Sequence, residues 1–349
     1  MDVLNLRSLP WVLAVAIAWM VTPLALAADS AVVLMYHRFG EDRHPSTSIR
    51  IDQFEAQLEH LREGGCTVIP LAHLLAALEG ESTDLPDRAV VITIDDAYRS
   101  VYDIAFPRFK EYGYPFTVFV ATDPVDSGLD GHMTWEQMRE MQKAGATFAN
   151  HGAGHLSLIE REDDESEDAW RERIGADVAK GRKRLNEELD PLPGAFAYPY
   201  GEYDPAVADM LADMGYVSFG QQSGAVGPLT DRRAVPRYPM AEAFGDMTQF
   251  RTKVASLPMP VTAVEPWNPV TTDRQPSIVI TVGPTDARLT ELACFVSSQG
   301  RAEIEWLEAG KRFRVGAVKP FEKGRQRVNC TAPTTSGRYQ WFTHPWVIR

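Results

Sequence analysis

Basic side chains are in short supply in this sequence of 349 residues. It has 35 lysines and arginines against 48 aspartates and glutamates, which gives a formal net charge of -13. No cluster of lysines and arginines stands out along the chain. Because nucleic acids and anionic lipid surfaces attract proteins through positive charge, neither is an expected partner. With 44% hydrophobic residues, the chain is instead expected to bury a sizeable core and to form more than one domain.

Long apolar runs are missing as well. The run Trp11 to Val21 has 11 residues and is too short to span a bilayer. Arg7 precedes it and Ala25-Leu26-Ala27 follows it, which is the pattern of a secretory signal peptide. We therefore expect residues 1–27 to be a signal peptide and the mature chain, without an integral membrane segment, to be periplasmic or secreted. Retention as an N-terminal anchor is the alternative, although Pro10 and Pro23 interrupt any longer helix.

Cysteine is scarce, with three residues in the chain. Cys294 and Cys330 both lie in the C-terminal segment, where an oxidising compartment would let them close a loop. We therefore predict a disulfide between them. Cys66 is left over in a turn that enters an apolar run, and we expect a buried free thiol there and not a nucleophile.

Apolar runs alternate with segments of helical period over roughly the first two thirds of the chain. On one predicted helix, Phe54, Leu58 and Leu61 share a face. The pattern predicts an α/β barrel or a doubly wound sheet over residues 28–257. Most runs are continuously apolar, as in strands buried on both faces of a parallel sheet; they cover residues 31–36, 89–94, 115–121, 146–150, 195–198 and 216–219.

The composition and the periodicity of the sequence change at residue 258. Residues 258–276 contain five prolines in 19 positions and show little periodicity, which predicts a linker. Short alternating runs separated by turns follow it. Together with the cysteine pair, these runs predict a small β-sandwich over residues 277–349.

Two carboxylates follow one of the predicted buried strands. Asp95 and Asp96 come directly after the run Ala89 to Ile94, and the carboxyl ends of strands are where α/β folds place their active sites. Adjacent residues on a regular strand face opposite ways, but at a turning strand end both can look into the mouth of a barrel. The alternative is that one aspartate caps a helix starting near Tyr98.

A histidine pair follows another strand, in the sequence His151-Gly152-Ala153-Gly154-His155. Two histidines four residues apart can reach one metal ion, and the glycines favour a tight loop. Two imidazoles and one carboxylate form a facial ligand set that leaves positions open for water and substrate. The alternative is a pair of surface histidines without a ligand role.

A third polar turn, Tyr198-Pro199-Tyr200-Gly201, follows the run that begins at Ala195. Gly201 lets the backbone approach a ligand, and Pro199 fixes the turn. The N–H of Tyr200 is a candidate oxyanion donor, and its ring is a candidate pocket wall. An ordinary aromatic turn is the alternative.

The three motifs Thr93-Ile94-Asp95-Asp96, His151 to His155 and Tyr198 to Gly201, in this order, resemble the leading motifs of the polysaccharide deacetylase family. This is the NodB-homology family, or carbohydrate esterase family 4. The start, Leu34 to Phe39, is similar to members that act on exported polysaccharides. The resemblance implies a distorted (β/α)7 barrel, with Asp95 as catalytic base. It also implies one divalent metal ion, zinc or alternatively nickel, cobalt or iron, held by Asp96, His151 and His155.

The chain departs from the family pattern at three points. Gly152 stands where a serine or threonine usually braces the ligand loop, and Ala197 stands where an arginine usually orients the base. The late histidine that serves as general acid has no evident counterpart, since only His344 follows His155. His37 is a candidate substitute, and a packed core histidine is the equal alternative.

The leading hypothesis is a metal-dependent hydrolase that removes N-acetyl groups from an exported or cell-wall N-acetylhexosamine polysaccharide. A barrel that has lost catalysis and serves as a carbohydrate-binding or assembly module is one alternative. A deacylase of other amides is another. Retention of Asp95 and of the three ligand candidates argues against the loss of catalysis. The sequence predicts no particular protein partner.

Overall fold

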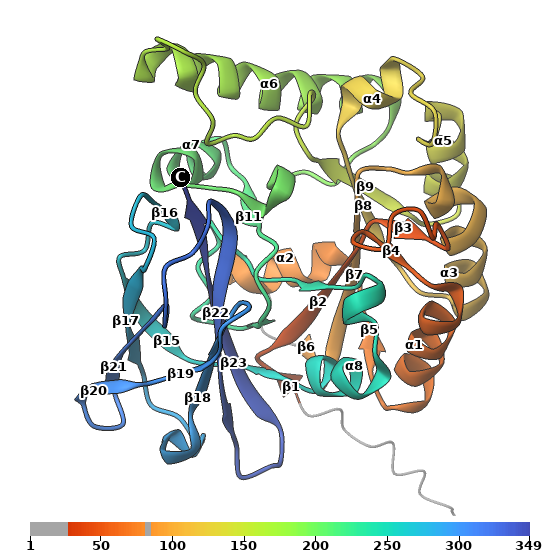
Figure 1. Ribbon diagram of the computed structural model, residues 1–349. Helices are drawn as coiled ribbons and strands as arrows, with labels where there is room; N and C mark the ends of the chain where they lie inside the picture. Colours follow the sequence, from red (N-terminus) through yellow and green to blue (C-terminus); the bar gives the residue numbers. More distant parts are fainter. Residues whose placement is uncertain (1–26, 81–84) are drawn as a thin grey trace, which may run out of the picture.

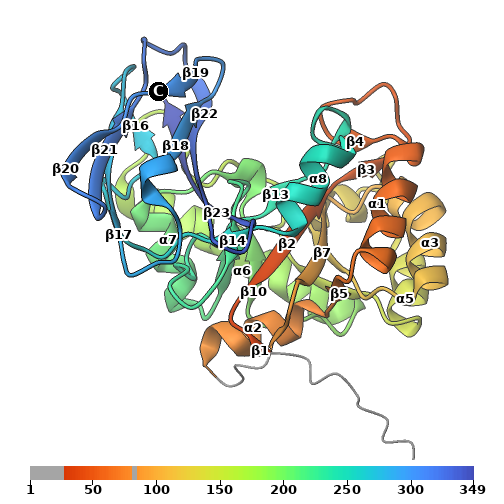
Figure 2. The same ribbon diagram turned by 90° about the horizontal axis from the view of Figure 1, so that it is seen from below.

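The computed structural model describes residues 27–80 and 85–349. Residues 1–26, which hold nearly all of the predicted signal peptide, lie outside the described residues. Two parts lie side by side in both views: a mixed α/β part and a β-rich C-terminal part (Figures 1 and 2). The helices are α1 (Ile51–Glu63), α2 (Leu71–Glu79), α3 (Phe106–Tyr112), α4 (Thr122–Asp126), α5 (Trp135–Lys143), α6 (Glu167–Glu188), α7 (Pro205–Asp213) and α8 (Met247–Val254).

A curled, mainly parallel sheet forms the centre of the α/β part. Its path runs β11-β10-β9-β8-β7-β2-β12, with β5 beside β7 and β13 beside β2. Only β12 is antiparallel to its neighbour. The strands are β2 (Ala31–Tyr36), β5 (Thr67–Val68), β7 (Ala89–Asp95), β8 (Thr117–Val120), β9 (Thr147–Asn150), β10 (Ala195–Ala197), β11 (Val217–Phe219), β12 (Ala225–Val226) and β13 (Tyr238–Pro239). The predicted α/β class and barrel-like sheet are confirmed.

The segment from Val235 to Pro239 bridges β11, at one end of this path, and β2, next to the other end. Val235 forms a parallel bridge with Phe219 of β11, and β13 pairs in parallel with β2. The curl of the sheet is therefore closed by a strand of poor regularity, in keeping with a distorted barrel. The sequence pattern did not predict a strand here.

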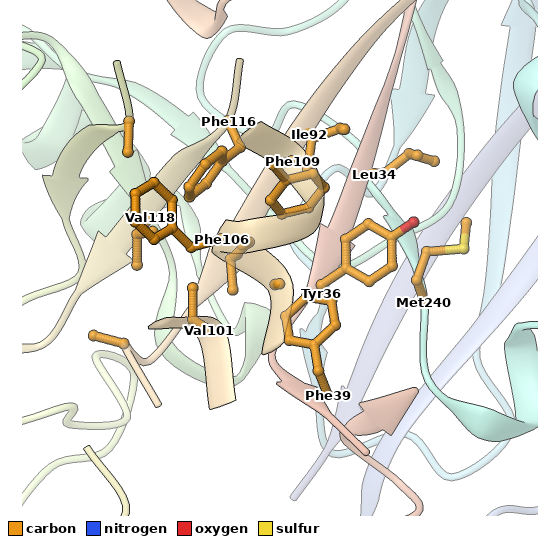
Figure 3. Close-up of a cluster of buried hydrophobic side chains, with 14 of the residues drawn as sticks. Leu34, Tyr36, Phe39, Ile92, Val101, Phe106, Phe109, Phe116, Val118 and Met240 are labelled. Atoms are coloured by element: carbon orange, nitrogen blue, oxygen red, sulfur yellow. The ribbon is translucent and has the colours of Figure 1, made fainter. Parts of the chain in front are cut away.

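Two apolar layers hold the sheet, one on each face. Leu34 and Ile92 project to the outer face, where they pack with helix residues such as Phe106 and Phe109 (Figure 3). Val33 and Val91 project to the opposite face and pack with Phe119 and other residues of the inner cluster. Strands buried on both faces explain why the sequence shows continuous apolar runs in place of alternation.

The C-terminal part consists of two packed sheets, and this confirms the predicted all-β region. One sheet has the path β14-β23-β22-β18-β19 with β16 beside β23, and the other has the path β15-β17-β21-β20. The strands are β14 (Leu257–Pro258), β15 (Val261–Glu265), β16 (Val270–Thr271), β17 (Ser277–Val282), β18 (Ala293–Val296), β19 (Gly300–Ala302), β20 (Glu305–Glu308), β21 (Arg312–Gly316), β22 (Gly324–Pro333) and β23 (Tyr339–Ile348).

The proline-rich segment 258–276, which we expected to be a linker, contributes β15 and β16 to these sheets. Its prolines lie before or after these two strands. Proline donates no backbone hydrogen bond, so it is compatible with strand ends and obscures the alternation that would predict short strands.

The remaining described strands are short: β1 (Ala27–Ala28) pairs with β6 (Leu85–Pro86), and β3 (Arg38–Phe39) pairs with β4 (Ser48–Ile49). Among the described helices, none is long and apolar enough to cross a membrane.

Cys294 on β18 and Cys330 on β22 lie directly opposite each other and form a disulfide. Both are fully buried in the core of the C-terminal sheets. Cys66 is partly buried, and burial raises the pKa of its thiol.

Replacing Cys294 and Cys330 together by alanine is expected to lower the stability of the C-terminal part by about 3–4 kcal/mol, because a loop of 36 residues is no longer closed in the unfolded chain. Denaturant unfolding followed by tryptophan fluorescence measures this loss, and Cys66→Ala is the matched control. Peptide mapping without reductant that finds both thiols free would contradict the prediction.

Candidate active site

The candidate residues gather at the carboxyl ends of β7, β9 and β10. Along β7, Val91, Thr93 and Asp95 share the face that looks into the barrel, because side chains alternate along a strand. Asp95 is the last residue of β7 and is fully buried. Its carboxylate therefore lies inside the barrel, just below the mouth.

Asp96 reaches the same mouth because the chain turns sharply after β7. The φ angles of Asp96 and Ala97 are 73° and 54°, a left-handed conformation that is costly for residues other than glycine. Two such residues in succession mark a turn that the surroundings must enforce. Helical residues begin at Arg99, but the carboxylates of Asp95 and Asp96 face Arg237 and the two histidines and not the N–H groups of this first turn, so the alternative of a helix cap is wrong.

The histidine loop brings its two imidazoles to the Asp96 carboxylate. The Nε2 atoms of His151 and His155 lie 3.3 and 3.1 Å from Asp96 Oδ1. Together the three side chains form a cluster whose ligand atoms all lie within 4.8 Å of one another. His155 itself has a φ of 53°, so this loop also carries backbone strain.

The protonation of His151 suits a cation. Its Nδ1 lies 2.7 Å from the carbonyl oxygen of Ala197, which fixes a proton on Nδ1 and leaves the Nε2 lone pair free to bind a metal. Asp96 Oδ1 is buried without a hydrogen-bond partner. A lone pair facing an unpartnered carboxylate oxygen is unfavourable unless a positive charge lies between them. The residues therefore fit a divalent metal ion with nitrogen and oxygen ligands.

The pKa values in this cluster follow from the same geometry. Burial alone would raise the pKa of Asp96, but the two neighbouring imidazoles, when they carry a proton on Nε2, donate to its carboxylate and hold the pKa well below its ordinary value. Asp96 is therefore an anion at neutral pH and can act as a ligand.

Helix α6 braces the histidine loop. Asp177 accepts hydrogen bonds from the backbone N–H groups of Ala153 and Gly154, at 3.0 and 2.8 Å. A Cβ atom at Gly152, whose φ is 79°, would lie 2.7 Å from the Asp177 carboxylate. We expected this loop to lack the hydrogen bond that a serine or threonine at position 152 would give. Asp177 supports the loop instead, and it can approach because Gly152 has no side chain.

Arg237 was not predicted as a site residue, yet it makes the closest contacts of Asp95. It comes from the segment that closes the barrel, and its Nη1 and Nη2 donate to the two carboxylate oxygens at 2.7 and 2.8 Å. Both side chains are fully buried. Burial alone would raise the pKa of Asp95, but the guanidinium outweighs it and lowers the pKa. Arg237 therefore orients the Asp95 carboxylate in this structure, where Ala197 provides no arginine.

His37 lies beside this pair at the end of β2. Its Nε2 is 3.9 Å from Asp95 Oδ2, and 14% of its side chain remains exposed to the mouth. Burial lowers the pKa of the imidazole, and the nearby Asp95 and Asp96 offset this only in part. His37 is thus neutral at neutral pH and close enough to exchange a proton with groups in the site.

The turn after β10 forms one wall of the mouth. Tyr200 has a φ of 59°, and 41% of the residue is exposed. Its ring packs edge-on against His155, with 4.6 Å between the ring centroids. Pro199 is buried beneath it, and Gly201 has a φ of 70°. The structure thus brings together every site residue that the sequence predicts around the barrel mouth.

Comparison with known proteins agrees with these motifs. Residues 82–219 match the polysaccharide deacetylase family profile. A poly-beta-1,6-N-acetyl-D-glucosamine N-deacetylase of Escherichia coli is 26% identical over 227 residues, 56% of this chain and 34% of that protein. The enzyme of the same name from Staphylococcus epidermidis is 26% identical over 229 residues, 60% of this chain and 78% of that protein. The chain thus spans only about a third of the Escherichia coli relative.

Solved structures show the same fold. IcaB from Ammonifex degensii is 27% identical, with a TM-score of 0.56 over 65% of this chain and 98% of that one. The Streptococcus pyogenes deacetylase PplD in complex with acetate is 20% identical, with a TM-score of 0.57 over 64% of this chain and 98% of that one. The resemblance of the barrel to the polysaccharide deacetylase family is confirmed.

If the cluster holds a cation, the double variant His151→Ala/His155→Ala is expected to lose it, because one carboxylate alone binds a divalent ion weakly. Elemental analysis of protein purified without added metal measures the stoichiometry, which should fall from about one ion per chain to about zero. His73→Ala/His44→Ala removes two histidines that belong to no part of the cluster and should keep the ion. Full occupancy in the first variant would contradict the assignment.

Proposed function

We propose that this chain, whose barrel resembles the polysaccharide deacetylases in sequence and fold, is a metal-dependent hydrolase that removes N-acetyl groups from an N-acetylhexosamine polysaccharide. The observation that carries the proposal is the cluster of Asp96, His151 and His155 beside a separately charged carboxylate, Asp95. Amide hydrolysis needs these two functions next to each other: a site that polarises the carbonyl and a base that takes a proton from water.

A divalent ion bound by Asp96, His151 and His155 would supply Lewis-acid polarisation and lower the pKa of water. The ligands have separate supports: Ala197 O orients His151, and α6 holds the loop through Asp177. These contacts fix the imidazoles before substrate arrives, so no binding energy is spent on ordering them.

Asp95 is the general base in this proposal. Its carboxylate is ionised because Arg237 lowers its pKa, and a bidentate guanidinium fixes its orientation. An ionised carboxylate can accept the proton of the attacking water. Arg237 acts on the reaction only through the position and charge of Asp95.

The other side of the mouth stabilises the developing charge. The N–H of Tyr200 is the proposed donor to the oxyanion that forms when the acetamide carbonyl is attacked. The departing amine needs a proton, and this is the proton that Asp95 has taken from water: Asp95 delivers it either directly or by way of the neutral His37, which accepts it and passes it to the nitrogen. The 3.9 Å separation between His37 and Asp95 permits a proton to pass between these two groups with a small movement.

The substrate class follows from the relatives and from the open mouth. Two matched proteins are named for poly-beta-1,6-N-acetyl-D-glucosamine, and we propose the same class of polymer for this chain. The exposed ring of Tyr200 offers a face on which a sugar can stack. A polymer of this kind is outside the cell, so the proposal includes an exported enzyme, in line with the buried disulfide.

Acetate release tests the function directly. The purified chain is expected to release acetate from poly-β-1,6-N-acetylglucosamine, and from chitooligosaccharides or peptidoglycan if its specificity is broad. A chelator should abolish release, and added zinc, cobalt or nickel should restore it. Asp95→Asn should lower kcat at least a hundredfold with the metal retained, because the base is lost. Wild-type turnover in Asp95→Asn would overturn the mechanism, and no release from any acetylated polymer would overturn the function.

His37→Ala separates the two routes for protonating the amine. If His37 is the general acid, kcat should fall on the order of a hundredfold with unchanged metal content. Comparison with His60→Ala, a change on α1 away from the mouth, controls for general effects of histidine removal. An unchanged kcat in His37→Ala would leave both proton transfers to Asp95.

A further inference from the structure

The C-terminal sheets reach the wall of the barrel mouth through one side chain. Arg325 on β22 donates from Nη1 to the carbonyl oxygen of Tyr200 at 2.7 Å. Its guanidinium carbon lies 5.8 Å from the centre of the Tyr200 ring, and its Nε is 3.8 Å from Glu202 Oε1. One arginine of the β-rich part therefore contacts the backbone, the ring and the following residue of this turn.

The turn that contains Tyr200 is strained and needs contacts from outside to hold it. Tyr200 and Gly201 both have positive φ angles, 59° and 70°, and only the second suits its residue without strain. A strained conformation persists only when the surroundings hold it. Within the turn, Gly201 N–H donates to Tyr198 O at 2.9 Å, but that bond leaves the Tyr200 carbonyl to an outside partner. Arg325 is that partner.

The residues that Arg325 contacts are themselves in contact with the histidine loop. Glu202 accepts a hydrogen bond at 2.7 Å from the hydroxyl of Ser157, two residues after His155. The Tyr200 ring packs on His155 itself. Arg325 thus contacts Tyr200 and Glu202, two residues that in turn contact the loop of His151 and His155.

We infer that Arg325 is a positioning residue of the active site and that the β-rich part completes the mouth of the barrel. By holding the Tyr200 carbonyl and Glu202, Arg325 restrains the strained backbone conformation of Tyr200, and through it the position of the Tyr200 N–H and the packing of the ring on His155. The expected effect of Arg325 on turnover rests on the proposed function. The structural link itself is independent of the substrate.

The side chain of Arg325 is 54% exposed, so its removal is expected to leave the sandwich folded. Arg325→Ala should lower kcat about tenfold or more with KM changed less than twofold, because a displaced oxyanion donor is missed only in the transition state. Metal content and melting temperature should stay at wild-type values. Arg325→Gln, which keeps a polar side chain and the first part of the stem but lacks the Nη1 donor, should show the same fall and guards against a folding failure of the alanine variant.

Arg314→Ala is the matched control. Arg314 belongs to the same β-rich part, is 44% exposed and pairs with Glu305 on the neighbouring strand β20, away from the mouth. This variant should keep wild-type kcat and KM. A rise in KM alone in Arg325→Ala would show that Arg325 binds substrate and would overturn the positioning role, as would an unchanged kcat.

Hydrogen exchange of the peptide covering residues 199–202 gives a readout that needs no substrate. Exchange at these amides should accelerate at least several-fold in Arg325→Ala and remain unchanged in Arg314→Ala. Accelerated exchange in a protein whose wild type releases no acetate would keep the structural link and overturn the proposed function. Unchanged exchange, together with full activity in Arg325→Ala, would overturn the inference and leave the function intact.

Discussion

The buried ion pair between Asp95 and Arg237 is the constraint on which the rest of the site depends. Two adjacent carboxylates at one strand end repel each other, and a carboxyl that is buried without a partner takes up a proton. The guanidinium of Arg237 meets both oxygens of Asp95 and keeps it charged. Asp96 is thereby left to the histidines. The two aspartates can therefore take different roles although they are neighbours in sequence.

A buried ion pair of this kind contributes little net stability, because desolvation of both charges offsets their attraction. The pair instead fixes the orientation and the charge of Asp95 just below the mouth of the barrel. The desolvation cost of this buried pair is offset by apolar packing around it. This packing comes from the inner apolar cluster below Asp95 and from the aromatic outer layer between sheet and helices, which Figure 3 shows. Ala97, in the sharp turn next to Asp96, is buried in the outer layer, which therefore helps to hold the strained backbone at this strand end.

Much of this arrangement is predictable from the sequence because it depends on strand ends. Carboxyl ends of parallel strands meet at one edge of a sheet, so polar motifs after apolar runs must gather there. From the sequence alone, this argument predicts that Asp95, His151 and Tyr200 share one rim of the sheet. The disulfide partners are predictable from the expected signal peptide and from the position of two cysteines in one segment.

The contacts that sequence reasoning missed come from far along the chain or from irregular segments. Arg237 is separated from Asp95 by 142 residues and lies in a closing strand interrupted by Pro236 and Pro239, so no periodicity marks it. Asp177 accepts hydrogen bonds from the histidine loop, but its position in the middle of the charged helix α6 gives no sign of this in the sequence. The strands β15 and β16 lie among prolines. Only the tertiary fold shows which of these residues meet.

The most direct measurement of the central claim is the turnover of Arg237→Met, with its metal content and the equilibrium stability of the fold measured on the same samples. The claim that Arg237 holds Asp95 as a charged, oriented base predicts that kcat falls by a hundredfold or more while the metal stays bound. It also predicts a loss of stability of about 3–5 kcal/mol, because a buried charge is left without its partner. Adding Asn at Asp95 in the same chain should lower kcat little further, since the two residues act as one unit. Wild-type turnover in Arg237→Met would contradict the account.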